Sequence, residues 1–376
     1  MPRNKTPLLF ERPEFLEQAR TQHYLNEILL PEKYIFPLFA PVNVSILMVT
    51  DASGGFDGRP FGLAELLNVL AVAPGPWVRF TVTTAHREND SSAMLKNFRF
   101  DTEDLSEYDQ IWLFGVERLP SYLSDAELRK ISEFMAGGGG VFATGDHEDL
   151  GGGLCARIPR VRNMRMWHWP GGGPNGEPVA PKVDESDRHD TLTRRAAEDI
   201  IFDHQSDDVP QEILPHLYIR LTGLLRKITY PHPVLCGPRG IIKQMPDHPH
   251  EGHCYKPSDL HHSFTFSGAT FEEYPNAADG SRPEPQVIAR SRHSARTQSD
   301  VKENLNPKTF GSIAVYDGHK AKIGRVLVDA TWHHFFNINL TGRPTAPDPY
   351  RLGFYGSAAG LDAYEDIKAF FRNIAV

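Results

Sequence analysis

The sequence predicts an α/β protein with a doubly wound, mostly parallel sheet and a large, loop-rich insertion. Over the first 150 residues, short apolar runs typical of buried strands alternate with segments of helical periodicity. This alternation is typical of parallel strands joined by right-handed helical crossovers. From about residue 156 to 310 it is replaced by loops rich in Pro and Gly, and it returns before the C terminus.

The individual elements follow from periodicity and from capping signals. The strands of the sheet are predicted at 42–49, 78–84, 110–115, 141–144 and 324–330. Helices are expected within 61–72 and 361–374. The clearest helix begins at Ser124, which forms a capping box with Glu127. It ends at Gly137, for which we expect a positive φ.

Length and composition bound the organisation of the chain. With 376 residues, of which 40% are hydrophobic, it can form two domains or one domain with insertions. We expect an N-terminal arm at 1–40, a core formed by 41–155 together with 310–376, and an elaboration at 156–309 that contributes to the site. The three cysteines form no CxxC pair, and no signal peptide or apolar run of about eighteen residues is recognised, so the cytoplasm is the expected location.

Charge and the lack of several motifs narrow the function classes. The net charge of -8, from 40 basic and 48 acidic residues, argues against a general nucleic-acid binder. No GxGxxG follows a strand, and neither a P-loop nor a GxSxG elbow occurs, which disfavours nucleotide cofactors and serine hydrolases. A small-molecule substrate is therefore the expected partner. A membrane and a nucleic acid are not expected as partners.

Polar residues follow the strand at 141–144, in the sequence Gly145-Asp146-His147-Glu148-Asp149. Functional side chains of parallel sheets gather just beyond the carboxyl ends of the strands. Asp146 and His147 are therefore candidate metal ligands, Asp146 is also a candidate catalytic residue, and Glu148 is a candidate general base. The alternative is helix capping, since Asp suits an N-cap and acids suit the first turn.

Histidines follow the last predicted strand, in Trp332-His333-His334. Adjacent residues of a strand point to opposite faces, so one of the two histidines is expected to face the site. His333 is a candidate catalytic residue and His334 a candidate metal ligand. A structural histidine is the alternative for each.

The loop at 247–253 (DHPHEGH) is the densest cluster of possible metal ligands. In an extended chain, His248 and His250 lie on the same side and are candidate ligands, and Glu251 is a candidate general base. A solvated polar loop is the alternative.

Two further segments are candidates for substrate binding. Asp51 and Ser53 lie in a Gly-rich loop after the first strand, whose backbone N–H groups suit an anion. Arg160, Arg162 and Arg165 are interleaved with tryptophans in the same segment, and such a set suits a phosphate, a carboxylate or a sugar face. A simple turn and a solvated surface, respectively, are the alternatives.

The order of these parts resembles the class I glutamine amidotransferase-like fold, a flavodoxin-like arrangement, and in particular its ThuA-like (trehalose-utilisation) branch. The likeness covers about 42–155 and 310–376. The turn Gly145-Asp146-His147 stands where such families have the nucleophile elbow, and Trp332-His333-His334 stands where they have the catalytic His. Asp146 replaces the nucleophilic Cys, and the nearest thiol, Cys155, follows glycines instead of an apolar strand. The resemblance thus implies the fold without the thioester chemistry.

Together these residues predict a metal-dependent hydrolase, or a lyase or isomerase with similar parts, acting on a small polar substrate that is sugar-derived or anionic. A divalent ion, zinc first among the candidates, would activate water or polarise a carbonyl. Two alternatives remain open. One is a metal-free hydrolase that uses Asp146 and His333. The other is a catalytically silent amidotransferase-like domain that binds a ligand or a partner.

Overall fold

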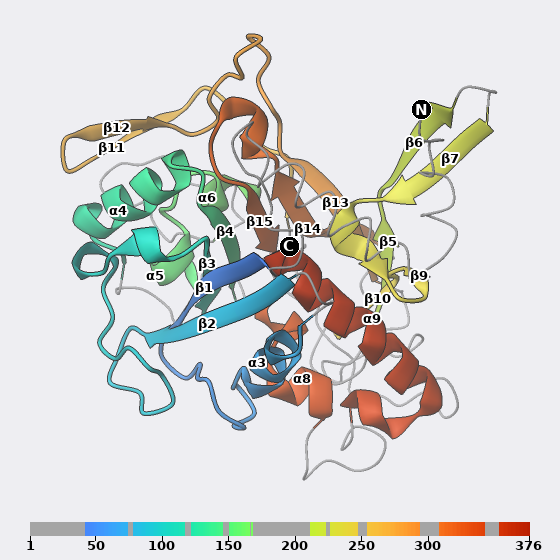
Figure 1. The fold of residues 1–376 in the computed structure, drawn as a ribbon. Coiled ribbons are helices and arrows are strands. Elements are labelled where there is room, and N and C mark those ends of the chain that lie inside the picture. Colours follow the sequence, from blue (N-terminus) through green and yellow to red (C-terminus); the bar gives the residue numbers. More distant parts are fainter. Residues whose placement is uncertain are drawn as a thin grey trace.

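The sheet at the centre of the molecule is mixed and has nine strands (Figure 1). The computed structural model describes residues 42–73, 78–116, 122–145, 150–165, 167, 211–222, 226–246, 254–293, 308–342 and 353–376. Helices pack on the sheet, so the α/β class predicted from the sequence is confirmed. None of the helices in these ranges is long and apolar enough to cross a membrane.

Five strands form the parallel part of the sheet, and they coincide with the five predicted runs. They are β1 (Val42–Thr50), β2 (Val78–His86), β3 (Gln110–Gly115), β4 (Gly140–Gly145) and β15 (Val326–Asp329). Their order is β15-β4-β3-β1-β2, and every neighbouring pair is parallel. The carboxyl ends of all five strands therefore lie at the same edge of the sheet.

Four antiparallel strands extend the sheet beyond β15. They are β14 (Lys308–Tyr316), β13 (Gln286–His293), β5 (Gln211–Pro215) and β10 (Gln244–Met245), in that order outward. Three of these strands come from 156–309. The segment predicted as an elaboration thus continues the same sheet as the core.

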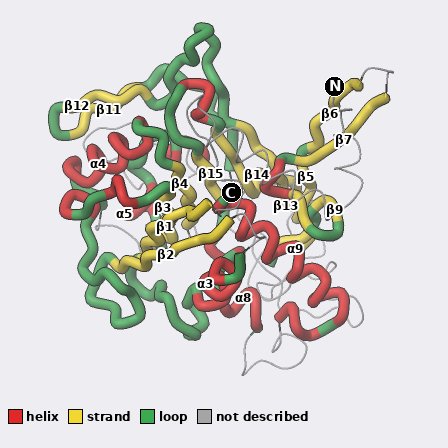
Figure 2. The backbone as a smooth tube through the Cα atoms, in the orientation of Figure 1, coloured by secondary structure: helices red, strands yellow, loops and turns green. Residues whose placement is uncertain are grey.

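Smaller elements surround the sheet. Three two-stranded pairs are β6 (Leu217–Thr222) with β7 (Arg226–Pro231), β8 (Cys236–Gly237) with β9 (Gly240–Ile241), and β11 (Ser263–Phe266) with β12 (Ala269–Glu272). The first and the last of these pairs are labelled in Figures 1 and 2. Short 3-10 helices in the described ranges span Phe100–Thr102, Leu105–Glu107, Pro233–Leu235, Gly318–Ala321, Trp332–His334 and Gly353–Gly356.

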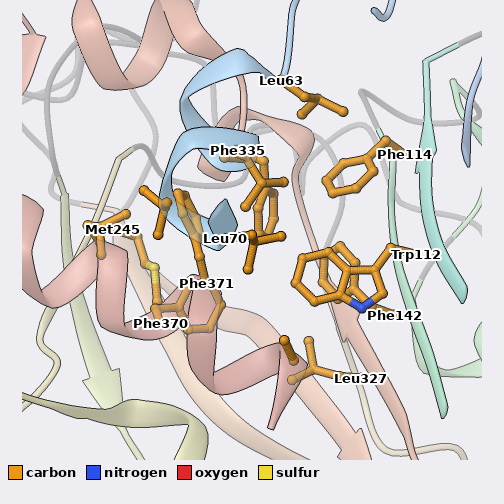
Figure 3. Close-up of a cluster of buried hydrophobic side chains, with 14 of the residues drawn as sticks. Leu63, Leu70, Trp112, Phe114, Phe142, Met245, Leu327, Phe335, Phe370 and Phe371 are labelled. Atoms are coloured by element: carbon orange, nitrogen blue, oxygen red, sulfur yellow. The ribbon is translucent and has the colours of Figure 1, made fainter. Parts of the chain in front are cut away.

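One face of the sheet is covered by α3 (Ala64–Ala71), α8 (Asn337–Thr341) and α9 (Ala358–Ala375). The helix α3 directs Leu66, Val69 and Leu70 into this core, which is the spacing of one helix face. Figure 3 shows the aromatic centre of the cluster, where the Phe335 and Phe371 rings stack with centroids 5.3 Å apart.

The other face is covered by α4 (Asp125–Ala136), α5 (Gly152–Cys155) and α6 (Val161–Met164). Leu128, Ile131 and Met135 of α4 are fully buried against it. Alternate residues of β1 enter the two cores, with Ile46 on the α9 side and Leu47 on the α4 side. Apolar residues on both faces explain why β1 is a continuous apolar run.

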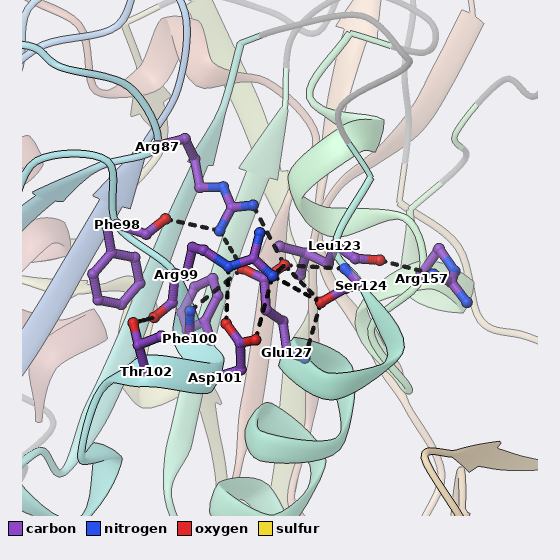
Figure 4. Close-up of polar contacts among 10 residues, drawn as sticks. All are labelled: Arg87, Phe98, Arg99, Phe100, Asp101, Thr102, Leu123, Ser124, Glu127 and Arg157. Atoms are coloured by element: carbon purple, nitrogen blue, oxygen red, sulfur yellow. Dashed lines mark hydrogen bonds and ion pairs between the residues drawn. The ribbon is translucent and has the colours of Figure 1, made fainter.

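The N terminus of α4 has the predicted capping box, and two arginines reinforce it (Figure 4). Arg87 donates to the Glu127 carboxylate, and Arg99 lies 3.6 Å from it. Burial by itself raises the pKa of Glu127, but the hydrogen bonds from Arg87 and Ser124 outweigh burial and hold the pKa below its usual value. Glu127 is therefore a buried anion at the positive end of a helix.

The C terminus of α4 corrects one prediction. Gly137 has φ -76, within the right-handed helical region, and Gly138 carries the positive φ of +102. The helix ends at Ala136 with Gly137 as its C-cap, so the left-handed residue follows one position later than the sequence suggests. The left-handed residue is still a glycine, as expected for a helix C terminus.

Candidate functional site

The carboxyl ends of four parallel strands form the carboxyl edge, which we define as Thr50, Gly115, Gly145 and Asp329 together with the described residues that follow each of them. Asp51, only 4% exposed, accepts a hydrogen bond from the Val116 backbone N–H at 2.7 Å. This bond ties the exit of β1 to that of β3. Strands β4 and β15 are paired neighbours, so the segments after 144 and 330 leave from the same edge, as predicted.

The main feature of this edge is a buried acid–imidazole pair. His334 and Asp329 are both fully buried, and His334 Nδ1 lies 2.8 Å from the Asp329 carboxylate. Asp329 also accepts a hydrogen bond from the Thr331 backbone N–H at 3.0 Å. A carboxylate accepts hydrogen bonds and donates none, so this contact places a proton on His334 Nδ1 and fixes the tautomer of the ring.

His333 and His334 do not alternate across a strand, which corrects the sequence-based expectation for them. Strand β15 ends at Asp329, and 332–334 form a 3-10 turn whose N-cap Thr331 accepts from the His333 N–H at 3.2 Å. His333 is 8% exposed, stacks on Trp332 with ring centroids 4.3 Å apart, and lies 3.2 Å from Asn339 Oδ1. The two rings therefore have different partners within one turn.

Arg165 links the carboxyl ends of the neighbouring strands β4 and β15. Its Nε donates to the Ala330 carbonyl at 3.0 Å and its Nη2 to the Gly145 carbonyl at 3.2 Å. The guanidinium is fully buried and lies 4.2 Å from the centre of the Trp167 ring. The planar guanidinium carries several N–H donors in a fixed geometry, so it can bind two carbonyls at once. The single ammonium group of Lys is less suited to this.

Arg160 and Arg162 are bound to Glu273, away from solvent. Arg162 Nη2 lies 2.8 Å from Glu273, and both side chains are almost fully buried. The Arg160 backbone N–H and guanidinium also donate to Glu273, and burial lowers the pKa of Arg160. Arg160 further adopts a positive φ of 71, which is costly for a residue with a side chain. Among the described residues, the bonds to strand ends at this edge come from Arg165, whereas Arg160 and Arg162 bind Glu273.

The loop after β1 packs over the segment after β15. Asn337 Nδ2 donates to the carbonyls of Asp57 and Arg59 at 2.8 Å, and its backbone N–H donates to Gly62. Ser53 is exposed on this loop. These bonds link residues about 280 positions apart and close one end of the carboxyl edge.

His86, at the carboxyl end of β2, is a second buried histidine beside the loop. Its Nε2 lies 3.1 Å from the Gly54 carbonyl, and its Nδ1 accepts from the Glu88 N–H at 3.0 Å. One nitrogen accepting and the other donating describes a neutral ring with the proton on Nε2. Both nitrogens are used, so His86 supports the loop that carries Asp51.

The thiol at this edge is not suited to nucleophilic chemistry. Cys155 is fully buried, and burial raises its pKa far above the ordinary value, with a further increase from the nearby Asp51. The same holds for Cys254, where burial is again the main cause of the raised pKa and Asp329 adds to it. Because the thiolate is the reactive species, both residues are inert core cysteines.

Several predicted site residues fall outside the described residues. These are Asp146, His147, Glu148, His248, His250 and Glu251. Within the described ranges, no group of three or more His, Cys, Asp or Glu side chains is arranged to hold a metal ion.

The structure adds residues that the sequence did not single out. Asp329 stands inside the run GRVLVDA, and its position at the carboxyl end of a strand was the available signal for it. His86 offered the same signal at the carboxyl end of β2, whereas Asn337 had none, because its partners are distant in the sequence.

Comparisons with known proteins do not assign the chain to a family. No family model matches it, and no curated protein does. Among solved structures, the mmIFT52 N-terminal domain is similar with a TM-score of 0.29 and 10% identity, over 77% of this chain and 88% of that one. Similarity at this level carries no argument about fold or function.

Proposed function

We propose that this protein is a hydrolase that acts on a small polar substrate at the carboxyl edge, with a divalent metal ion held there in part by His334. The supporting observation is the Asp329–His334 pair, fully buried with Nδ1 at 2.8 Å from the carboxylate. A metal-binding His usually donates its other ring N–H to a carboxylate, which orients the ring and makes the metal-binding nitrogen more basic. Zinc is the ion that best suits imidazole combined with carboxylate ligands.

The strand order supports the place of the site and the finer fold proposal. Numbered along the chain, the parallel strands have the order 2-1-3-4-5, which is that of flavodoxin-like, doubly wound sheets. Such sheets bind ligands outside the carboxyl ends of their strands. We therefore retain the doubly wound, amidotransferase-like core as a proposal, with the ThuA-like branch as the pattern that it resembles.

The other ligands would come from segments that start at this edge. Asp146 and His147 follow Gly145 directly in the sequence, and Arg165 holds the Gly145 carbonyl beside that of Ala330. We propose these two residues as further ligands, together with His248 and His250. A bound ion would activate water, and Glu148 or Glu251 would take its proton.

We assign substrate contacts among the predicted residues by the exposure of each side chain and by the hydrogen bonds that it already makes within the protein. Ser53 is exposed on the β1 loop and is kept as a candidate contact. Asp51 and the three arginines already make hydrogen bonds within the protein, so we assign them to shaping the site.

The same pair also favours a metal-free alternative. An Asp that holds His Nδ1–H and leaves Nε2 as a general base is the arrangement of Ser-His-Asp hydrolases. In that case His334 itself would take the proton from water or from a substrate hydroxyl.

Metal analysis of protein purified without a His tag separates these proposals. We expect stoichiometric zinc in the wild type and in His261→Ala, which removes an exposed histidine of the segment before β11, and loss of zinc in His334→Ala. Hydrolysis of a panel of small esters, amides and glycosides is then measured with and without a chelator. Chelator-resistant hydrolysis that requires His334 would select the metal-free alternative. A protein with neither zinc nor hydrolysis would be the silent binding domain.

A further inference from the structure

The β6–β7 hairpin, called here the ribbon, projects from the end of the molecule that carries β5 and β13 (Figures 1 and 2). Its two strands are antiparallel and form a sheet with each other alone. Within the described residues, the outer edges of both strands therefore lack a strand partner. An isolated two-stranded ribbon is only marginally stable in water, so it gains from a surface on which to dock.

The two faces of the ribbon differ in their surroundings. On one face Tyr218 and Tyr230 stack with centroids 5.7 Å apart, and Tyr218 Oη donates to the Gln286 side chain on β13 at 2.7 Å. The opposite face carries Leu217 and Ile219, which are 43% and 59% exposed. Thr229 pairs with Ile219, and Lys227 stands two residues from Thr229, so both lie on this same face, and both are exposed.

The charge of this region is opposite in sign to that of the whole chain. Residues 213–246 contain five Lys and Arg and no Asp or Glu, whereas acidic residues exceed basic ones by eight in the complete sequence. Arg220 and Lys227 of the ribbon are exposed, and so is Lys243 near its base. The exposed aliphatic side chains thus lie on a segment whose own charged residues are all basic, and of these Arg239 pairs with Asp362 and Asp366 of α9.

We propose that the exposed face of the ribbon binds an anionic lipid surface. Aliphatic side chains next to cations match the acyl and headgroup layers of such a surface, and a few residues are enough for reversible binding. A stable protein–protein interface needs about 20–30 residues on each side, far more than this face offers. A second copy of the ribbon would bring like charges together, and a nucleic acid offers little to Leu217 and Ile219.

The test is sedimentation of the full-length protein with phosphatidylcholine vesicles that contain or lack phosphatidylserine. We expect binding to the anionic vesicles alone, weakened by salt. The double variant Ile219→Asp with Lys227→Glu should bind about tenfold more weakly or worse, since it removes an inserted side chain and reverses a cation. The matched control is Met94→Asp with Lys96→Glu, which makes the same changes on an exposed loop remote from the ribbon and should bind as the wild type does.

The proposal would be overturned by no binding, by equal binding to both kinds of vesicle, or by equal loss in the ribbon variant and its control. Binding to a DNA duplex that the ribbon variant abolishes, without vesicle binding, would overturn it in favour of a nucleic acid. Thermal unfolding of both variants verifies that they are folded. If the ribbon variant unfolds, the single variant Lys227→Gln provides the same comparison with a smaller perturbation.

Discussion

At the scale of single residues, the state of the His334 ring determines what the carboxyl edge can do. The carboxylate of Asp329 lies 2.8 Å from Nδ1 and is fully buried with it. A buried ionised group is stable only if its hydrogen bonds are satisfied, and Thr331 together with His334 provides them. The pair is therefore both a structural unit and a means of fixing the ring's tautomer.

The tautomer gives a prediction that needs no substrate. In the wild-type protein, ¹⁵N NMR should show His334 with its proton on Nδ1. Asp329→Asn keeps the shape but can present an amide N–H to the ring, so the proton is expected to move to Nε2. Asp279→Asn, an exposed control, should leave the His334 signals unchanged. A His334 ring with its proton on Nε2 in the wild type would contradict the assigned pair.

A second residue-scale prediction concerns the end of α4. Gly138 has φ +102, and a Cβ placed there would meet no atom within 4 Å, so Gly138→Val is costly through backbone strain alone, by about 1–3 kcal/mol. Gly137 has an ordinary φ of -76, and a Cβ there would approach no atom closer than 3.4 Å, so Gly137→Ala should be tolerated. Thermal unfolding midpoints measure both. Equal midpoints for the two variants would contradict the assignment of the left-handed conformation to Gly138.

At the scale of elements, the start of α4 joins the loop after β2 to the helix through one carboxylate. Glu127 accepts hydrogen bonds from Ser124 and Arg87 while almost fully buried. The sequence predicted the capping box from the Ser124–Glu127 spacing, but the arginines come from 28 and 40 residues away. A local motif thus became part of the packing between elements.

Glu127→Gln should therefore lower stability at neutral pH by about 2 kcal/mol, the size of a hydrogen bond to a charged group. The folded-state pKa of Glu127 lies below its usual value, so its contribution is complete above the unfolded pKa of about 4.3. It is lost as the pH falls through the lower folded pKa. The midpoints of wild type and variant should converge under acid. A difference that stays constant with pH would refute the linkage.

At the scale of the whole molecule, one sheet unites segments that differ in sequence character. Ile213, Met245 and Ile288 from the antiparallel part share a core with Phe370 and Phe371 of the C-terminal helix. The parallel and antiparallel parts also join directly through β14 and β15. Such continuity predicts that the two parts unfold together.

Ile288→Ala tests this continuity. Ile288 is fully buried, so its truncation should cost about 2–5 kcal/mol. Hydrogen exchange should then speed up in β1 and β3 as well as in β13, in a single cooperative transition. The exposed Val72→Ala should change stability by no more than about 0.5 kcal/mol. Faster exchange confined to β5 and β13 would show two independent units.

The sequence by itself determined the parallel strands, the capping box and the carboxyl edge, because apolar runs, caps and strand ends are local signals. Each of the five predicted strands is present, and the turn after β15 leaves from the edge that was inferred. Only the tertiary structure decided the side-chain partners. Arg160 and Arg162 bind Glu273, more than 100 residues away, and the antiparallel strands join a sheet that their loop-rich sequence did not indicate. Their partners are chosen by burial and hydrogen bonding between distant segments, which no local pattern encodes.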